Sequence, residues 1–340
     1  MKIVILAGGL SPEREVSLSS GSLIANALIE NGHRVLLLDV YRGLPTLPKD
    51  PDTLFTSSAD FSYQIPKEIP DLQALKKECQ NGEALIGPNV LPLCQLADRV
   101  FLALHGGIGE NGQLQATLDA FGIRYTGSGY VGSLLAMDKD IAKRILRDAG
   151  IPTPDWICME AKKADEQAVL SSIGLPCVIK PCSCGSSVGV SLVRTREQLH
   201  AALEAAALWD GRILAEKMIV GRELTVGILD ATALPLVEIL PKDGFYDYQN
   251  KYQGSTEEVC PAQVGKDVVK KAQELSLCGF SSLHLGGYAR FDFILDSEDQ
   301  LWCLEANTLP GMTPTSLLPL AAKTAGISYG ELCEKIVALS

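Results

Sequence analysis

The stretch GYARFDFILDSEDQLWCLEAN, residues 287–307, indicates two apolar strands, 287–295 and 300–305, joined by a short polar turn. We expect a β-hairpin here because a few polar residues separate two runs rich in aromatic and branched side chains. A two-residue turn at Glu298 and Asp299 would make the numbers of opposed residues add up to 597. That register decides which polar side chains face one another, and a one-residue slip would separate them.

The polar side chains of this hairpin form a candidate metal site. Residues two apart in a strand share a face, so Arg290 lies beside Asp292, and Glu305 lies beside Asn307. In the expected register Asp292 opposes Glu305, and two opposed carboxylates repel. Mg²⁺ bound by both carboxylates and the Asn307 amide oxygen would remove the conflict. A solvated acidic hairpin without a metal is the alternative.

Upstream, KPCSCGSSVG at 180–189 places a lysine at the end of an apolar strand, before a loop of small residues. Such a loop can fold over phosphates and offer backbone N–H groups, with Lys180 supplying charge. An ordinary Ser/Gly hairpin is the alternative. The sequence GSGYVG at 127–132 formally fits a dinucleotide fingerprint, but no acidic strand end follows about 20 residues later, so we interpret it as a close-packed loop.

The first third of the chain alternates apolar runs with amphipathic stretches, which predicts a parallel βαβ sheet. Two glycine-rich loops, 7–17 and 105–112, follow strands of this sheet, at the edge where ligands bind. Glu13 in the first loop could receive an ammonium group or be a solvated acid. Ser17 is expected to N-cap the next helix. We interpret His105, beside the second loop, as a ligand-binding residue.

Later segments continue the α/β pattern. A helix over 133–149 is expected to end at Gly150, where Pro152 and Pro154 mark a boundary. Strands, helices and loops then alternate to a final helix over 329–339, and the polar loop 243–259 is a candidate lid.

The charge balance and the hydrophobic content of the sequence indicate what class of protein it encodes. The 340 residues carry 30 Lys and Arg against 41 Asp and Glu, a formal net charge of -11 that argues against nucleic acid as a partner. With 46% hydrophobic and 21% charged residues the chain is typical of a globular protein of two or three domains.

The sequence predicts no signal peptide, no membrane span and no disulfide framework. There is no apolar run of about 18 residues, and the first strand enters a polar loop rather than a cleavage site, so we expect a cytoplasmic protein with no membrane partner. The ten cysteines include no CxxC pair and are expected to be reduced.

Taken with their order, these motifs make the sequence resemble the ATP-grasp enzymes, and within them the D-alanine:D-alanine ligase family, over nearly the whole chain. The matching blocks are GGLSPEREVS (8–17), HGGIGENG (105–112), MDK (137–139), KP with GSSVG (180–189), EK with GRE (216–223), FYDY with KY (245–252), ARFDF (289–293) and EANTLPGMT through Ser316.

The resemblance implies an ATP-grasp fold of mixed α/β and α+β class. It implies a parallel-sheet N-terminal domain, 1–127, followed by a two-part ATP-grasp domain, 128–217 and 218–340. It implies ligation of two D-alanines to D-alanyl-D-alanine, driven by ATP through a D-alanyl phosphate, for peptidoglycan synthesis. The implied cofactors are ATP and two Mg²⁺ or Mn²⁺, with a monovalent cation possible, and the implied assembly is a homodimer.

The resemblance also assigns roles. The implied ATP contacts are Lys139 and Lys180 for the phosphates, Glu216, Lys217 and Ile219 for adenine, and Glu223 for ribose. The implied metal ligands are Asp292, Glu305 and Asn307. The implied D-alanine residues are Glu13 with Ser186 and Tyr252 for the first ammonium, His105 nearby, Arg290 and the Gly311 N–H for the oxyanion, and Ser316 with Leu317 for the second D-alanine.

Three other functions remain open at this point. A D-alanine:D-lactate ligase would take a hydroxy acid as second substrate, although Tyr252 resembles the dipeptide-forming enzymes. A nucleotide-binding module without catalysis would not need to keep Arg290 together with Asp292 and Glu305. Another ATP-grasp ligase, such as a glutathione or dipeptide synthetase, would leave the two glycine-rich loops unexplained.

Overall fold

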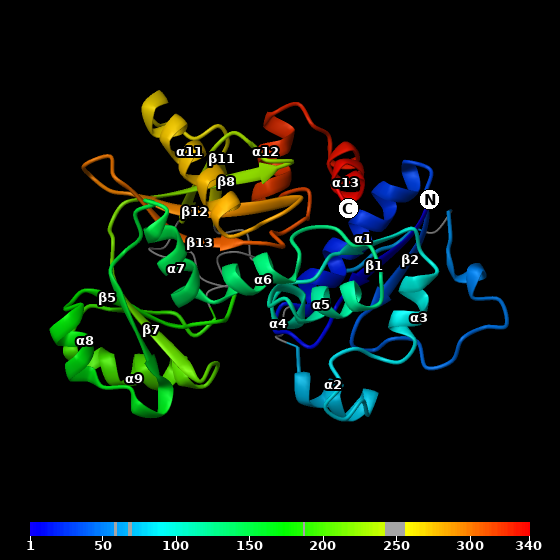
Figure 1. Cartoon of the computed structure of the whole chain (residues 1–340), viewed down its shortest axis with the longest axis horizontal. Helices are drawn as coiled ribbons and strands as arrows, with labels where there is room; N and C mark the ends of the chain where they lie inside the picture. Colours follow the sequence, from blue (N-terminus) through cyan, green and yellow to red (C-terminus); the bar gives the residue numbers. More distant parts are fainter. Residues whose placement is uncertain (58–59, 67–69, 186–187, 242–255) are drawn as a thin grey trace.

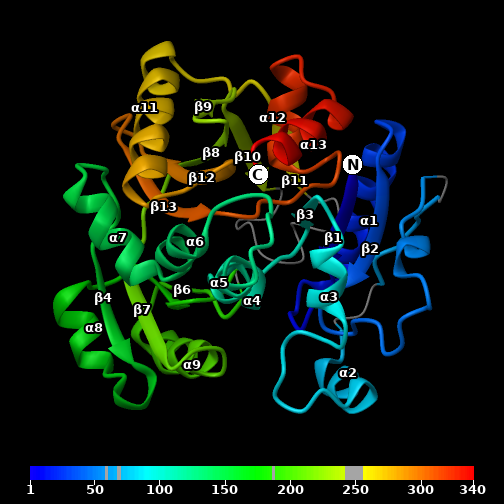
Figure 2. The same ribbon diagram turned by 45° about the vertical axis from the view of Figure 1, so that its right-hand side comes forward.

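The computed structural model describes residues 1–57, 60–66, 70–185, 188–241 and 256–340. The described strands form three sheets, each with its own helices (Figures 1 and 2). Each sheet lies within one of the three predicted ranges, while the division into domains stays a prediction. None of the described helices is both long enough and apolar enough to cross a bilayer.

The first sheet is parallel, as predicted, with strand order β2-β1-β3. Its strands are β1 (Lys2–Ala7), β2 (Arg34–Asp39) and β3 (Arg99–Leu102). The helices of this part are α1 (Arg14–Glu30), η1 (Pro51–Leu54), α2 (Leu72–Cys79), α3 (Val90–Gln95), α4 (Gly107–Glu110) and α5 (Gln113–Ala120).

The expected N-cap role of Ser17 is wrong. Helix α1 begins three residues earlier, with Glu13 at its N-cap position and no side-chain cap. The Ser17 hydroxyl instead accepts from the Gly8 N–H at 2.8 Å and donates to the Ala103 carbonyl at 2.6 Å. Ser17 therefore ties together the two loops that follow β1 and β3.

The second sheet is antiparallel and has the order β4-β7-β5-β6. Its elements are β4 (Trp156–Glu160), η2 (Ala161–Lys163), α8 (Glu166–Ser172), β5 (Cys177–Pro181), β6 (Ser191–Val193), α9 (Arg196–Ala207) and β7 (Arg212–Lys217). Strand β6 begins two residues after Gly189, whose φ of +70° departs from the extended conformation.

The third sheet has the order β11-β10-β8-β12-β13, with β9 paired to β8. Its elements are β8 (Arg222–Leu229), β9 (Thr232–Ala233), β10 (Val237–Pro241), β11 (Thr256–Val259), α11 (Lys266–Ser282), β12 (Tyr288–Leu295), β13 (Leu301–Asn307) and α12 (Leu317–Thr324). Helix α12 was not predicted from the sequence.

The predicted pairs of the β12–β13 hairpin are confirmed, but the predicted turn is wrong. Asp292 opposes Glu305, and Arg290 opposes Asn307. Three residues, 297–299, form the turn, because the Asp296 N–H bonds the Gln300 carbonyl and Asp299 adopts φ +58°. A bulge between Asp292 and Phe293 shifts the register back by one residue.

The single helix expected over 133–149 is two helices, α6 (Tyr130–Met137) and α7 (Lys139–Asp148). Asp138 breaks it with an extended backbone, φ -79° and ψ 99°, and its carboxylate caps α7 by accepting from the Ile141 N–H at 3.1 Å. The Arg212 guanidinium also binds the Asp138 carboxylate. The break places Lys139 in the first turn of α7.

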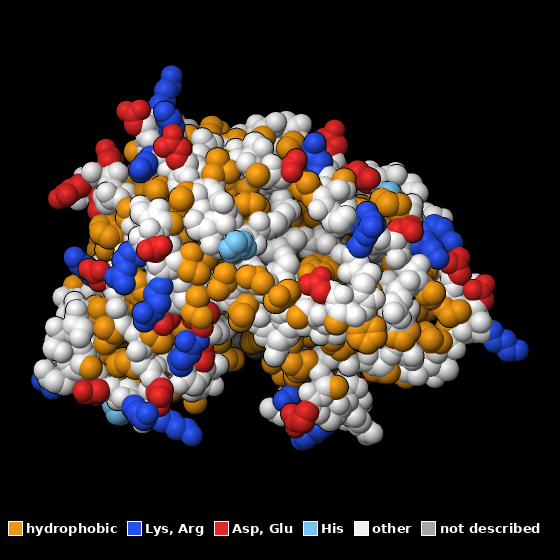
Figure 3. Space-filling view, viewed as in Figure 1, with side chains coloured by type: hydrophobic (Ala, Val, Ile, Leu, Met, Phe, Trp, Pro, Cys, Tyr) orange, Lys and Arg blue, Asp and Glu red, His pale blue; other side chains and the backbone are white. Residues whose placement is uncertain are grey.

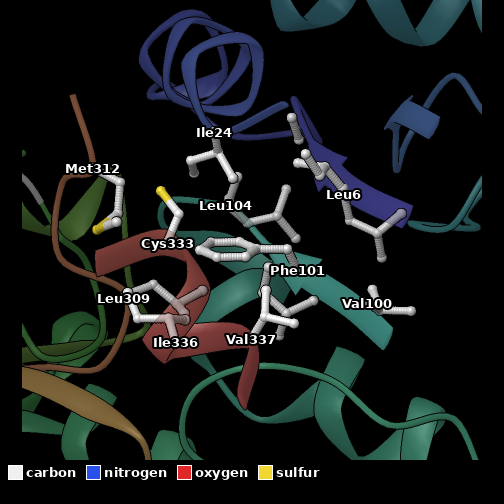
Figure 4. Packing of buried hydrophobic residues seen from close by; sticks show 14 of the residues in the cluster. Leu6, Ile24, Val100, Phe101, Leu104, Leu309, Met312, Cys333, Ile336 and Val337 are labelled. Atoms are coloured by element: carbon white, nitrogen blue, oxygen red, sulfur yellow. The ribbon is translucent and has the colours of Figure 1, made fainter. Parts of the chain in front are cut away.

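The last helix, α13 (Tyr329–Ala338), packs against α1 beside the first sheet (Figure 1). Its residues Cys333, Ile336 and Val337 lie around the Phe101 ring in the same core as Ile24 (Figure 4). The C-terminal helix therefore contributes to the hydrophobic core of the N-terminal sheet.

We expect Phe101→Ala to lower the free energy of unfolding by about 3–5 kcal/mol, because it leaves a cavity in this core. Phe101 is 0% exposed, whereas Phe121 is 51% exposed and provides the matched control Phe121→Ala. Urea unfolding of both variants measures the difference. Equal losses would contradict the packing described for α13.

Candidate active site

A cavity of about 450 Å³ lies between the second and third sheets. All six side chains predicted to contact ATP line it, and two predicted metal ligands lie at its rim: Lys139, Lys180, Glu216, Lys217, Ile219 and Glu223, with Asp292 and Glu305. Apolar walls with a few convergent charges are typical of a small-molecule site. The structure therefore brings the predicted nucleotide residues together.

A buried ionic network centred on Glu216 lies beside this cavity, and Lys180 and Glu216 belong to the cavity lining. The two oxygens of Glu216 accept from two lysines, Lys180 at 2.5 Å and Lys143 at 2.9 Å. Lys143 also donates to the Thr153 hydroxyl at 2.6 Å. Burial opposes ionisation of Glu216, but the charges of both lysines outweigh burial and lower its pKa to about 2. Glu216 is therefore ionised.

Lys139 lines the cavity between the second and third sheets and also contacts the rest of the site. Its ammonium donates to the Cys184 carbonyl at 2.5 Å and lies 3.8 Å from a Glu305 oxygen. These three residues also line a second, small cavity together with Glu110 and Asn307. Lys139 and Glu305 thus line both cavities. Glu110, in the segment after β3, lines the small cavity and so lies near the larger one.

Asp292 is held firmly within the hairpin. Its carboxylate accepts from both Nε and Nη2 of Arg290 at 2.8 Å and from Asn307 Nδ2 at 2.9 Å. The hydroxyl of Thr225, on the neighbouring strand β8, donates to it at 2.7 Å. In this structure the Arg290 guanidinium balances the Asp292 charge.

The predicted metal ligands fit Mg²⁺ by the chemistry of their donors. Among the described residues no three His, Cys, Asp or Glu side chains gather, so a site here needs the Asn307 amide as its third ligand. Two opposed carboxylates and an amide oxygen are hard oxygen donors, which Mg²⁺ prefers. Asp292, Glu305 and Asn307 supply that set from two paired strands.

The two glycine-rich loops meet at Glu13. Gly106 has φ +64°, and a Cβ there would lie 2.9 Å from Ser11 Oγ and 3.0 Å from Glu13 Oε2. A Cβ on Gly185 would lie 3.4 Å from the same Glu13 oxygen. A side chain at Gly106 would be strained at this φ and would crowd Ser11 and Glu13, and the loop after β5 reaches the same carboxylate at Gly185.

His105 lies in the same region and bridges two parts of the chain. Its Nδ1 lies 3.2 Å from the Leu309 carbonyl, and among the described residues its buried Nε2 has no hydrogen-bond partner. Burial lowers the pKa of His105, although the nearby Glu13 charge opposes the shift. The neutral ring therefore joins the N-terminal loop to the loop after β13.

Gly311, Ser316 and Leu317 follow in that loop. Ser316 stands at the N-cap position of α12 and makes no side-chain cap; its hydroxyl instead contacts Thr313 Oγ1 at 2.7 Å. The first N–H groups of α12, beginning at Leu317, can therefore receive a carboxylate. Ser186, Tyr252 and most of the predicted lid, 243–255, lie outside the described residues.

Two titratable residues of the site, the partly buried Glu110 and the buried Lys143, have no role in the sequence prediction. Glu110 closes the second glycine-rich loop by accepting from the Gly106 N–H at 2.6 Å. Lys143 stands four residues after Lys139 on α7, so it lies on the same side of that helix. The four-residue spacing from Lys139, which was predicted to contact phosphate, could have identified Lys143 as a residue of the site.

We expect the stability of the protein to depend on pH through Glu110. Burial and the charge of Glu13 raise its pKa from 4.5 to about 7, so the native state holds this proton more tightly than the unfolded chain. The protonated Glu110 therefore contributes to the free energy of unfolding below pH 4.5, and this contribution is lost as pH rises through about 7. Urea unfolding between pH 5 and 8 should show a steeper loss for the wild type than for Glu110→Gln. Parallel curves would contradict the shift.

The described residues on the face of the molecule drawn in Figure 3 form no basic patch. On that face Lys and Arg side chains are interspersed with Asp and Glu and do not gather over one element (Figure 3).

The fold and the site define an ATP-grasp protein, in which lysines and carboxylates line a cavity between two sheets. Residues 2–128 match the family model described as D-ala D-ala ligase N-terminus, and residues 145–338 match D-ala D-ala ligase C-terminus. The chain belongs to the D-alanine–D-alanine ligase family.

Individual relatives agree. The chain is 42% identical to a D-alanine–D-alanine ligase of Pediococcus pentosaceus, covering 99% of this chain and 97% of that protein. It is 38% identical to the ligase of Lacticaseibacillus casei, over 99% and 95%. The crystal structure of the Bacillus anthracis D-alanine–D-alanine ligase complexed with ATP superimposes with a TM-score of 0.78 at 30% identity, covering 100% of this chain and 97% of that one.

Proposed function

We propose that the protein joins two molecules of D-alanine into D-alanyl-D-alanine, with ATP converted to ADP and phosphate, for the synthesis of peptidoglycan. The observation that carries the proposal is the junction at Lys139 and Glu305, which line both the nucleotide cavity and the small cavity beside Glu110. An amino acid held near Glu13 and His105 would thus lie next to the terminal phosphate of ATP.

The first step activates a carboxylate. A carboxylate oxygen of the first D-alanine attacks the γ-phosphorus of ATP and ADP leaves, which gives an acyl phosphate. Lys139 and Lys180 balance the charge on the phosphates from one side of the cavity. Mg²⁺ held by Asp292, Glu305 and Asn307 would neutralise phosphate oxygens when bound. Glu13, with Ser186 and Tyr252, would hold the ammonium of this D-alanine.

The second step forms the peptide bond. The neutral amine of the second D-alanine attacks the acyl carbon, and phosphate leaves with the oxygen that the carboxylate contributed. Arg290 and the Gly311 N–H would stabilise the charge that develops on the carbonyl oxygen. Ser316 and the first N–H groups of α12, at Leu317, would bind the carboxylate of the attacking D-alanine.

The proposal extends to the adenine contacts Lys217 and Ile219, to the ribose contact Glu223 and to a lid over 243–259 that excludes water. It includes the three domains 1–127, 128–217 and 218–340, a homodimer in the cytoplasm, and a monovalent cation as an added activator. Sedimentation would show whether the chain dimerises.

The proposal is tested by phosphate release from MgATP with a panel of D- and L-amino acids, and with D-alanine mixed with D-lactate. We expect release with D-alanine and a dipeptide as the main product at neutral pH. Activity with L-amino acids alone would overturn the proposal, and a predominant depsipeptide would make the protein a D-alanine:D-lactate ligase.

A further inference from the structure

Lys143 is a buried charge for which the proposed reaction has no use. Its side chain is 1% exposed, and its ammonium contacts Glu216, Thr153 and the face of Trp156, whose centroid is 5.0 Å away. The described lining of the nucleotide cavity includes Lys180 and Glu216 but not Lys143. Lys143 therefore acts through Glu216 rather than on the nucleotide.

The network holds one positive charge more than Glu216 can balance. Lys180 occupies Oε1 of Glu216 and Lys143 occupies Oε2. Lys180 and Glu216 share one face of the sheet, because Lys180 pairs with Leu214, two residues before Glu216 on β7. Lys180 is thus paired with a carboxylate in this structure, although the proposed function requires it to bind a phosphate.

We infer that Lys143 is a positioning residue, which keeps Glu216 neutralised so that Lys180 can leave this carboxylate and bind a phosphate of ATP. The inference rests on the proposed function of the cavity. Removing one partner from a buried ion pair is costly when the other charge remains unpaired. With Lys143 in place, the departure of Lys180 leaves Glu216 with one ammonium, and no charge is left unpaired.

The geometry fixes Lys143 in that role. Thr153 and Trp156 hold its ammonium from two other directions, so it stays with Glu216 when Lys180 moves. Lys180 leaves only Oε1, so Oε2 of Glu216 keeps its ammonium throughout.

The experiment compares equilibrium binding of ATP and of adenosine, by calorimetry, to the full-length wild type and to Lys143→Met, Glu216→Gln and the double variant. Lys143→Met should weaken ATP binding by about tenfold or more, equivalent to about 1.4 kcal/mol, because Lys180 must stay with Glu216. Adenosine, which has no phosphate, should bind within about twofold of wild type. Lys163→Met, at an exposed ion pair with Glu160, is the matched control.

The double variant separates this role from a purely structural one. Glu216→Gln removes the charge that retains Lys180, so adding it to Lys143→Met should restore most of the preference for ATP over adenosine. Equal weakening of both ligands by Lys143→Met, or no recovery in the double variant, would overturn the inference. Should Lys143→Met fail to fold, Lys143→Gln, which keeps a donor without the charge, takes its place in the same cycle.

The inference and the proposed function fail in different ways. Absence of ATP binding to the wild type would refute the proposed function and, with it, the inference. Wild-type binding of ATP, together with unchanged ATP affinity in Lys143→Met, would refute the inference alone.

Discussion

Replacing Glu305 by glutamine is expected to reduce MgATP-dependent turnover by about a thousandfold and to leave the fold unchanged. Glu305 faces Asp292 across the β12–β13 pair, so its carboxylate would complete the oxygen set proposed for Mg²⁺. A correctly held metal contributes several kcal/mol to phosphoryl transfer, and each 1.36 kcal/mol changes the rate about tenfold. Steady-state phosphate release and Mn²⁺ binding by electron paramagnetic resonance measure the two effects.

The matched control is Glu298→Gln, in the turn of the same hairpin, where the carboxylate is exposed and distant from the cavity. It should keep wild-type turnover and metal binding. Turnover of Glu305→Gln within tenfold of the wild type, with intact Mn²⁺ binding, would show that Glu305 is not a metal ligand.

Replacing Arg290 by lysine should lower kcat by about a hundred- to a thousandfold. The guanidinium donates two hydrogen bonds to Asp292 from one plane, and a lysine cannot reproduce this fork. If Arg290 also donates to the carbonyl oxygen during peptide-bond formation, its loss removes a donor worth about 3–4 kcal/mol. The effect should fall on kcat rather than on the KM for ATP, because Arg290 does not line the nucleotide cavity as described.

An arginine at the start of α9, Arg196, is exposed and provides the control Arg196→Lys. Its kinetics should match the wild type. A variant Arg290→Lys with unchanged kcat and a raised KM for ATP would place Arg290 in nucleotide binding and contradict the assignment.

The hairpin shows why part of the site was predictable from the sequence. Side-chain alternation and a short turn were enough to pair Asp292 with Glu305 and Arg290 with Asn307. The turn itself was wrong by one residue, and the bulge after Asp292 corrected the register. Alternation is a local property, whereas a bulge depends on how the strand packs against its neighbours.

Other features depend on contacts between distant segments. Ser17 looked like an N-cap, but its partners are Gly8 and Ala103, and only folding brings Ala103 close. Asp138, where the predicted helix breaks, also binds Arg212, which lies 74 residues further along the chain. Such residues carry ordinary local patterns, so the sequence alone did not distinguish them.

The sequence contains a local pattern that points to the buried network at Glu216. Lys143 follows Lys139 by four residues on a helix, yet an amphipathic helix normally exposes its lysines. Its burial results from the meeting of α7 with Glu216 on β7 and with Thr153 before β4. The family resemblance predicts which residues contact ligands, and the structure adds Lys143, which contacts the predicted adenine residue Glu216.

The central claim is that ATP phosphorylates the carboxylate of one D-alanine and that a second D-alanine displaces the phosphate. The most direct measurement uses D-alanine labelled with ¹⁸O in its carboxylate, with mass spectrometry of both products. The account predicts D-alanyl-D-alanine and inorganic phosphate in equal amounts, with one ¹⁸O atom transferred to each phosphate. Dipeptide with unlabelled phosphate, or phosphate released without dipeptide, would contradict it.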